Sequence, residues 1–348
     1  MISKLANVET LVVRCPNWVG DVVMATPVFE CLRASLPRAR IIGVMKKSMF
    51  GIVKDSPWFD AVVDGNDKSW AGFGHMREHL RSLTPDAAIL LTNSLRSALT
   101  MRLCGIRQIY GYRRQGRGLL LTGGPTASRT GKAVPIPMLD YYLEICRWLE
   151  LDLPKQPRPQ LFIGDELHRR AESLLAKWGI VKGDFLVGFI PGASFGPSKC
   201  WPAESFAELA ELCQKRLAAK LILFSGPGEE DVVRAVLGRT KAPIIDPRAE
   251  GTDLDMLKPL VKRCNLLIAN DTGPRHYAVA FDVPVVVIIG PTDPRYTNAN
   301  LERTRIVRKE LDCSPCHKRV CPRQHECMKE IRPTEVLAAA EQLVRVHR

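Results

Sequence analysis

Residues 185–202 read Phe-Leu-Val-Gly-Phe-Ile-Pro-Gly-Ala-Ser-Phe-Gly-Pro-Ser-Lys-Cys-Trp-Pro. The first six form an apolar run typical of a buried strand, and a helical stretch begins near Pro202. The loop between them is rich in glycine and other small residues, so its backbone amides can approach a diphosphate, and Lys199 can neutralise that charge. The stretch therefore predicts a strand, a loop and a helix around an anion site. The alternative for Lys199 is an ordinary solvated loop lysine.

The same alternation of strand-like runs and amphipathic stretches continues along the chain, which is typical of parallel sheets covered by helices. One segment, 152–160 (DLPKQPRPQ), carries three prolines and predicts an extended linker. We therefore expect an α/β protein with two Rossmann-like domains, 1–155 and 156–348, which face a central cleft. The strands are expected at 10–14, 41–45, 87–91, 185–190, 221–225, 266–269 and 284–290, and a last helix at 333–346.

The net charge of the 348-residue chain is +13, which predicts an acidic partner such as a nucleotide diphosphate, an anionic lipid or a nucleic acid. Neither a G-x-G-x-x-G nor a G-x-x-x-x-G-K-[ST] motif is present, which argues against a dehydrogenase and a P-loop kinase. The N-terminus lacks a long apolar signal region, so we expect a cytoplasmic protein that at most touches a membrane surface. The basic stretch holds Arg96, Arg102, Arg107, Arg113, Arg114 and Arg117, with Tyr110 and Tyr112 between them.

Two further turns follow predicted strands. Asp21 stands where a helix begins, after Arg14-Cys-Pro-Asn-Trp-Val-Gly, and helical character is expected to continue to Leu36. Asp21 is either the N-cap of that helix or a general base at the top of a strand. The second turn, 270–276, reads Asn-Asp-Thr-Gly-Pro-Arg-His; its amides, the Thr272 hydroxyl and His276 could meet an anion at a helix N-terminus.

The acidic pair Glu229 and Glu230 follows another strand-like run. Such residues can bind ribose hydroxyls, or they can simply favour the first turn of a helix, and the pattern leaves both interpretations open. Asp253-Leu-Asp255 matches the D-x-D of metal-dependent transferases, but Thr252 and Asp253 also look like helix caps, which we favour.

In this order, the motifs at 17–27, 93–98, 191–202 and 270–273 resemble glycosyltransferase family 9, the heptosyltransferases, and the likeness is strongest to the heptosyltransferase II branch. The resemblance covers nearly the whole chain. It implies a GT-B fold and inverting transfer of L-glycero-D-manno-heptose from ADP-heptose to a heptosyl-Kdo-lipid A acceptor in the lipopolysaccharide core. It also implies that no cofactor is required for catalysis, and it places the enzyme at the cytoplasmic face of the inner membrane, in peripheral contact with it.

The resemblance also assigns roles to residues. Asp21 is expected to be the base, and Lys199 is expected to stabilise the diphosphate. The chain departs from the family pattern at Pro274-Arg275; Arg275 adds a phosphate contact or marks a branch with another sugar. Donor binding is expected for Ser194, Glu229, Glu230, Asp271, Thr272, Gly273 and His276, and acceptor binding for Asn93, Arg96, Arg113 and Arg114.

Four cysteines near the C-terminus, Cys313, Cys316, Cys321 and Cys327, follow the spacing C-x2-C-x4-C-x5-C, with His317 and His325 between them. Four thiolates can form a closed tetrahedral zinc site, which would be structural because no coordination position stays open. Free thiols and disulfides are the alternatives, and disulfides are rare in the cytosol.

Two other functions stay open. The first is a family 9 transferase for another sugar of lipopolysaccharide or capsule. The second is a nucleic-acid-binding protein with a C-terminal zinc knuckle that uses the basic stretch 96–117. We favour a transferase without a nucleic-acid partner, because nucleic-acid binding leaves both glycine-containing turns unexplained.

Overall fold

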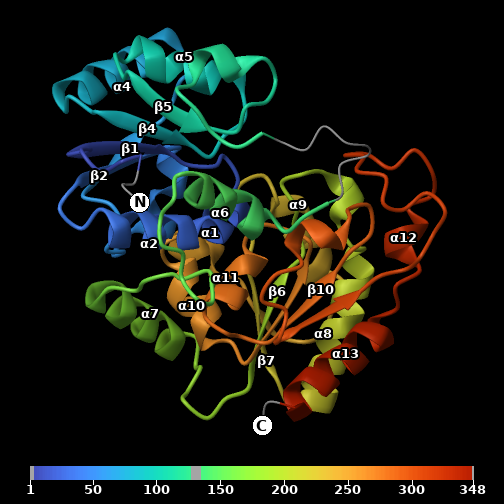
Figure 1. Cartoon of the computed structure of the whole chain (residues 1–348). Coiled ribbons are helices and arrows are strands. Elements are labelled where there is room, and N and C mark those ends of the chain that lie inside the picture. The colour runs from blue at the N-terminus through green and yellow to red at the C-terminus, as the bar shows by residue number, and fades with distance from the viewer. Residues whose placement is uncertain (1–3, 127–134, 347–348) are drawn as a thin grey trace. The chain divides into compact units, whose positions relative to one another are not determined.

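The structure is a computed structural model that describes residues 4–126 and 135–346 (Figure 1). The chain divides into two compact units, Met1–Gln160 and Leu161–Arg348. Each unit contains one parallel sheet in its described residues. The α/β class predicted from the alternating pattern is therefore confirmed.

The first unit has a five-stranded sheet in the order β3-β2-β1-β4-β5 within the described residues. Its strands are β1 (Thr10–Arg14), β2 (Arg40–Met45), β3 (Ala61–Asp64), β4 (Ala87–Leu90) and β5 (Gln108–Gly111). Its helices are α1 (Val19–Met24), α2 (Thr26–Ser35), α3 (Phe50–Val53), α4 (Trp70–Ser82), α5 (Leu95–Leu103) and α6 (Met138–Trp148), with 3-10 turns η1 (Lys47–Met49) and η2 (Arg117–Leu120).

The second unit has a six-stranded sheet in the order β11-β10-β9-β6-β7-β8 within the described residues. Its strands are β6 (Leu186–Ile190), β7 (Lys220–Leu223), β8 (Ile244–Ile245), β9 (Leu266–Asn270), β10 (Val285–Ile288) and β11 (Thr304–Val307). Its helices are α7 (Asp165–Lys177), α8 (Ala203–Leu217), α9 (Glu230–Leu237), α10 (Leu257–Arg263), α11 (Arg275–Ala280), α12 (Glu326–Lys329) and α13 (Pro333–Val346). Its 3-10 turns are η3 (Pro197–Lys199), η4 (Pro247–Glu250) and η5 (Pro294–Thr297).

The sequence predicted one continuous helical stretch from Asp21 to Leu36, but the structure has two helices in this segment. Helix α1 ends at Met24, and α2 begins at Thr26 with Pro27 in its first turn. Proline has no N–H for an intrahelical bond and is favoured at a helix start, so the break falls here. The proline-rich segment ends on the first unit: the backbone N–H of Gln160 donates to Thr26 Oγ1 (2.9 Å).

The loop that carries Lys199 is anchored to the core of the second unit by Trp201. Trp201 is fully buried among Phe189, Phe206 and residues of α13. Its indole Nε1 donates to the carbonyl oxygen of Ile331 (3.0 Å). A buried tryptophan whose N–H is hydrogen-bonded is well anchored, and Lys199 lies two residues before it in the chain.

Candidate functional site

The side chain of Asn270 connects the loops that follow β6 and β9. Asn270, the last residue of β9, is fully buried. Its Nδ2 donates to the carbonyl oxygen of Pro191 (2.6 Å), and its Oδ1 accepts from the N–H of Trp201 (3.1 Å). Because both polar ends are bonded inside the protein, Asn270 holds the two motif loops together. We did not predict this role, although the residue opens the motif at 270–276.

Lys199 lies in a largely buried ionic cluster at these strand ends. Its Nζ donates to Asp271 Oδ2 (2.7 Å) and to the Asp271 carbonyl oxygen (3.0 Å). Thr292, in the loop after β10, also donates to Asp271 Oδ2 (2.7 Å), and Arg275 Nε donates to Oδ1 (3.3 Å). The structure therefore brings together three neighbouring strand ends on one carboxylate. Thr292 had no signal in the sequence, because its contact depends on strand order.

The cluster carries more positive than negative charge. Burial alone would raise the pKa of Asp271, but Arg275 and Lys199 outweigh it and hold that pKa well below its usual range. Burial, followed by the charge of Arg275, holds the pKa of His276 well below its usual value, so this imidazole is neutral at pH 7. Two cations thus share one carboxylate, which leaves a charge of about +1 for an anionic ligand.

Arg275 is itself buried, and it pairs with Asp271 four residues earlier in sequence. Thr272 and Gly273 stay partly exposed, whereas His276 is buried. Helix α11 is short, at six residues. In the described residues, the positive charge at this turn therefore comes from the side chains of Arg275, in the turn, and Lys199, which binds it, more than from the helix dipole.

Glu229 lies against the glycine-rich loop. Its carboxylate accepts from the N–H of Gly226 (2.7 Å), and a Cβ placed on Gly192 would lie within 2.3 Å of its carboxylate atoms. Burial raises the pKa of Glu229. Glu230 is exposed and accepts from the N–H of Gly228 (3.2 Å), which is the behaviour of a helix-start residue. Ser194 is exposed in the same loop as Gly192.

Asp253 and Asp255 make structural contacts inside the second unit. Asp253 accepts from the N–H groups of Asp255 (3.0 Å) and Met256 (2.9 Å), and Asp255 pairs with the buried Lys258 (2.8 Å). The capping interpretation of this segment is the one that agrees with the structure.

The cysteine segment packs on the turn that carries Lys199. The Ser198 N–H donates to the Arg319 carbonyl oxygen (3.1 Å), and the Ser198 hydroxyl donates to that of Lys318 (2.6 Å). His325 Nε2 donates to the Ser198 carbonyl oxygen (2.8 Å). Gly196, with φ of 151°, has no room for a Cβ, because the Arg319 carbonyl oxygen would lie 2.6 Å from it. The segment thus binds the N–H, hydroxyl and carbonyl groups of Ser198 in η3.

The four cysteines line one cavity of about 210 Å³, together with Ser198 and His325. Burial raises the pKa of Cys327 to about 11, and Cys321, Cys316 and Cys313 add to the increase. Among the described residues, no three His, Cys, Asp or Glu side chains are already close enough to hold an ion. The thiols are therefore gathered in one place without forming a ready-made coordination shell.

In the first unit, Asp21 lies in the first turn of α1 and is partly buried. The N-cap is Trp18, three residues before Asp21, so the interpretation of Asp21 as the N-cap is wrong. Burial raises the pKa of Tyr142 on α6 well above its usual value, and the charge of Asp21 and a hydrogen bond to it add to the increase. Asp21 is therefore held by a buried phenol that we did not predict.

The neighbouring residue, Tyr141, reaches another predicted position. Its hydroxyl donates to Asn93 Oδ1 (3.0 Å), which also accepts from Arg117 Nη2 (3.4 Å). Adjacent tyrosines of α6 thus contact the turns after β1 and β4. Arg96, Arg113 and Arg114 are exposed, so they are available to a ligand.

Part of the basic stretch is structural. Arg117 is fully buried and donates to the carbonyl oxygen of Tyr112 (2.8 Å), and burial lowers its pKa to about 10. Arg102 Nε donates to the carbonyl oxygen of Leu120 (2.9 Å). Tyr110 and Tyr112 are buried, and Tyr112 stacks on Tyr141 with ring centres 4.0 Å apart. These aromatic rings cannot stack on nucleic-acid bases, which counts against a nucleic-acid groove.

Comparisons with known proteins agree with this organisation. The sequence profile of glycosyltransferase family 9 (heptosyltransferase) matches residues 74–326. The lipopolysaccharide heptosyltransferase 2 of Salmonella typhimurium is 26% identical over 346 residues, which covers 94% of this chain and 97% of that protein. The solved structure of Escherichia coli ADP-heptose LPS heptosyltransferase II is 24% identical with a TM-score of 0.79, and it covers 97% of this chain and 99% of that one. A family 9 structure from Veillonella parvula is 23% identical with a TM-score of 0.84, and it covers 99% of both chains. These structures confirm the GT-B fold.

Proposed function

Because the chain belongs to glycosyltransferase family 9, we propose that it transfers L-glycero-D-manno-heptose from ADP-heptose to the heptosyl-Kdo-lipid A inner core of lipopolysaccharide. Curated relatives that match over nearly the whole length carry the name heptosyltransferase 2. In the chain itself, the observation that carries the proposal is the cluster of Lys199, Asp271 and Arg275, with its surplus positive charge. Such a cluster suits a diphosphate leaving group.

The proposed reaction is a single displacement with inversion. Asp21 takes the proton of the acceptor hydroxyl, and the acceptor oxygen forms a bond to the anomeric carbon of the heptose. The bond from that carbon to the β-phosphate oxygen breaks, and its electron pair leaves with ADP. Lys199 and Arg275 lie in a preorganised cluster, so their charge meets the negative charge that grows on the diphosphate without further reorganisation. A hydrogen bond from Tyr142 would keep the Asp21 carboxylate oriented.

The remaining donor contacts are assigned by position. Gly192 and Ser194 would let the glycine-rich loop approach the diphosphate, and the Glu229 carboxylate beside that loop would accept a ribose hydroxyl. Thr272, Gly273 and His276 would complete the phosphate side of the site, and Glu230, which is exposed at the start of α9, would contact the nucleoside at its edge.

On the acceptor side, Asn93 would orient a sugar hydroxyl, because Tyr141 and Arg117 already fix its amide. Arg96, Arg113 and Arg114 are exposed, and they would bind the carboxylate and phosphate groups of a Kdo-lipid A acceptor. The acceptor is anchored in a membrane, so the protein would work at the cytoplasmic face of the inner membrane.

The four cysteines would hold one structural zinc ion, and catalysis would need no cofactor. Thiolates are ligands that zinc prefers, and all four line one cavity. Bound metal would stiffen the segment that grips Ser198 and thereby the turn of Lys199. Purified protein should contain about one zinc per chain, and a chelator should lower the melting temperature. Protein without metal whose four thiols titrate freely in the native state would contradict this assignment.

The deciding experiment is a donor screen against a heptosylated Kdo-lipid A acceptor, with ADP-heptose compared with other nucleotide sugars. Transfer with ADP-heptose at a rate far above the others supports the proposal. Preference for another sugar would leave the glycosyltransferase assignment intact and change the donor. Arg275, where the chain departs from the family pattern, would then be the first candidate for the residue that selects that sugar. Thermal stabilisation by ADP, with no response to oligonucleotides, would exclude a nucleic-acid-binding role.

A further inference from the structure

Helix α5 of the first unit has solvent-exposed leucines along one face. Leu95, Leu99 and Leu103 recur every four residues, so they share a face of the helix, and they are 49%, 45% and 49% exposed. The opposite face carries Ala98 and Met101, which are fully buried in the core of the unit. Helix α5 therefore has two apolar faces, and only one of them is used by the fold.

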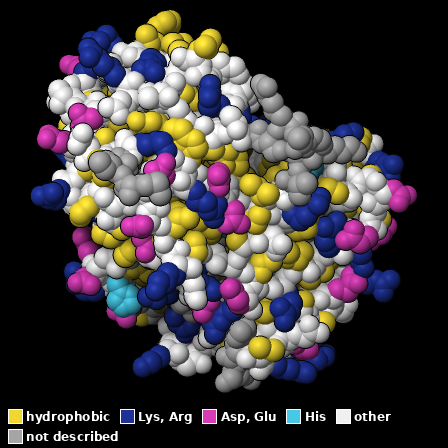
Figure 2. Space-filling view, viewed as in Figure 1, with side chains coloured by type: hydrophobic (Ala, Val, Ile, Leu, Met, Phe, Trp, Pro, Cys, Tyr) yellow, Lys and Arg dark blue, Asp and Glu magenta, His cyan; other side chains and the backbone are white. Residues whose placement is uncertain are grey.

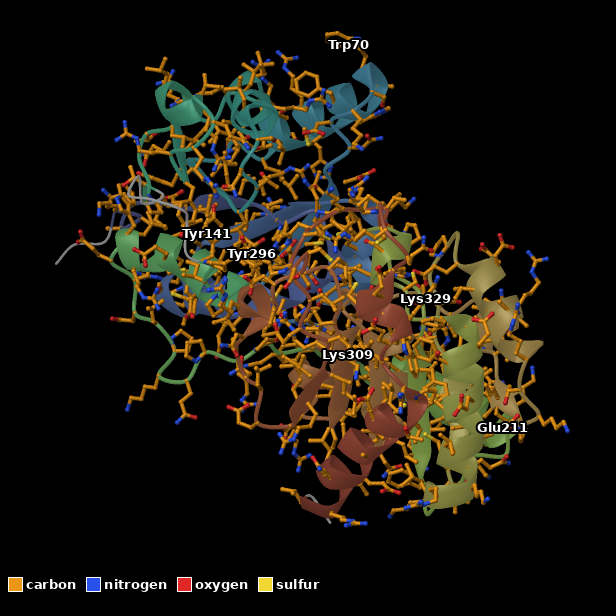
Figure 3. All side chains as sticks on the ribbon, turned by 90° about the vertical axis from the view of Figure 1, so that its right-hand side faces the viewer. Trp70, Tyr141, Glu211, Tyr296, Lys309 and Lys329 are labelled. Carbon is orange, nitrogen blue, oxygen red and sulfur yellow. The ribbon has the colours of Figure 1, made fainter. Side chains whose placement is uncertain are left out.

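Neighbouring elements extend this surface. Turn η2 packs against α5, and its Leu119 is 97% exposed. Helix α4 is tied to α5 by Arg77, whose Nε donates to the Leu103 carbonyl oxygen (3.0 Å). Trp70, in the first turn of α4, is 91% exposed and projects into solvent (Figure 3). Figure 2 shows hydrophobic side chains at the top of the view, over α5, with Lys or Arg side chains beside them.

The same part of the chain is strongly basic. From residue 70 to residue 120 the sequence holds eight arginines, whereas its acidic residues are Glu78 and Asp86. Arg96, Arg113 and Arg114 are exposed on α5 and on the loop that leads to η2. A surface that combines exposed leucines and tryptophan with arginines is complementary to the headgroup region of an anionic bilayer, where apolar side chains enter and cations meet phosphates.

We propose that this surface, the α5 face (Leu95, Leu99, Leu103, Leu119 and Trp70, with Arg96, Arg113 and Arg114), docks on a bilayer that contains anionic phospholipids. No helix in the described residues has the length and apolar character to cross a membrane, and docking needs none. The inference rests on the proposed function, because a glycolipid acceptor requires the enzyme to reach a membrane surface. It deepens that function by assigning the contact to particular residues of the first unit.

The test measures binding of the full chain to vesicles that lack glycolipid, so it does not depend on donor or acceptor. Phosphatidylcholine vesicles are compared with vesicles that also contain phosphatidylglycerol, in a sedimentation assay at two salt concentrations. The variant L99Q/L103Q/L119Q removes apolar contacts. The matched control, V181Q/V346Q, changes exposed apolar residues of the second unit.

We expect the wild type to bind the anionic vesicles at least tenfold more tightly than the neutral ones, and high salt should weaken this binding. The leucine variant should bind at least tenfold more weakly, and the control should bind like the wild type. The variant R113Q/R114Q should lose about 25-fold, since each basic residue near an anionic surface adds roughly fivefold. The leucine variant should keep its activity on a water-soluble, deacylated acceptor and lose it on acceptor in vesicles.

Equal vesicle binding by the wild type and the leucine variant would overturn the proposal. If the face instead binds a second copy of the chain, light scattering will show a dimer that the leucine variant converts to a monomer, with vesicle binding unchanged. That result also overturns the bilayer assignment. Inactivity on every heptosyl acceptor, with intact vesicle binding, would refute the proposed function and leave the docking surface standing.

Discussion

Arg275 offers the sharpest test of how the cluster acts, and the change to make is Arg275→Met. Asp271 is shared: Oδ2 accepts from Lys199 and Oδ1 from Arg275. Without Arg275, the single carboxylate offsets the charge of Lys199, and the surplus of about +1 disappears. Methionine fills much of the buried volume without the charge, so the electrostatic effect is separated from a cavity effect.

The magnitude follows from Coulomb's law. If we take a separation of roughly 8 Å between the charge of Arg275 and the growing negative charge, with an effective dielectric of about 20, the interaction contributes about 2 kcal/mol. This corresponds to a loss of roughly 30-fold in kcat. Arg275→Lys keeps the charge and should recover part of the loss. Breaking a buried pair typically costs about 3–5 kcal/mol, and we expect a stability loss near the lower end, because Asp271 keeps Lys199 and Thr292.

The assay must separate charge from general damage. Steady-state kinetics well below the melting temperature are combined with calorimetric binding of ADP and of adenosine. Loss of charge should weaken ADP binding at least tenfold more than adenosine binding, whereas a loosened fold would weaken both equally. Arg248→Met is the matched control, because Arg248 also pairs with an aspartate, Asp246, at the surface of the same unit. Unchanged kcat together with an unchanged ratio of ADP to adenosine affinity would refute the reasoning.

Asp21→Asn should keep ADP binding and lower kcat by about 10² to 10⁴, the usual contribution of a general base; turnover near the wild-type rate would leave Asp21 without a catalytic role. Lys199→Ala should lower kcat by roughly 10² to 10³, and if only the KM for the donor rises, the lysine binds ground and transition states alike. Tyr142→Phe should lower kcat by about tenfold or less and shift the acidic limb of the pH–rate profile, because the phenol contacts Asp21; an unchanged profile would argue for a purely structural tyrosine. His276 should make the fold less stable in acid. Its unfolded form gains a proton below about pH 6.5, while the folded form, with its lowered pKa, does not. The free energy of unfolding should therefore fall between pH 7 and pH 5, by up to about 1.4 kcal/mol per pH unit, and thermal melts of His276→Asn should show a flatter slope.

Much of the fold could be predicted from local pattern. The apolar runs at 10–14, 185–190 and 266–269 are strands β1, β6 and β9, and all three lie inside their sheets. Interior strands of a parallel sheet are buried on both faces, so they read as continuous apolar runs. The strands that we did not predict are β3, β5, β8 and β11, the sheet edges in the described residues. These strands are short and partly exposed, so their sequences lack such runs.

The candidate site also has a part that the sequence indicated and a part that only the structure shows. Lys199 and Asp271 were candidates because each follows a strand in a turn whose composition suits an anion site, whereas the pattern around Asp21 left a cap and a base open and only the family resemblance favoured the base. Two partners of these residues were not predicted: Thr292, which binds Asp271, and Tyr142, which binds Asp21, come from distant parts of the chain.

The exposure of the arginines could not be predicted either. Arg113 and Arg117 stand in the same basic stretch, yet Arg113 is exposed and Arg117 is buried. Local composition determines which segments can form strands, turns and helices, because these depend on neighbours along the chain. Which charges face each other, and which are left for a ligand, depends on strand order and packing, and only the tertiary structure decides that.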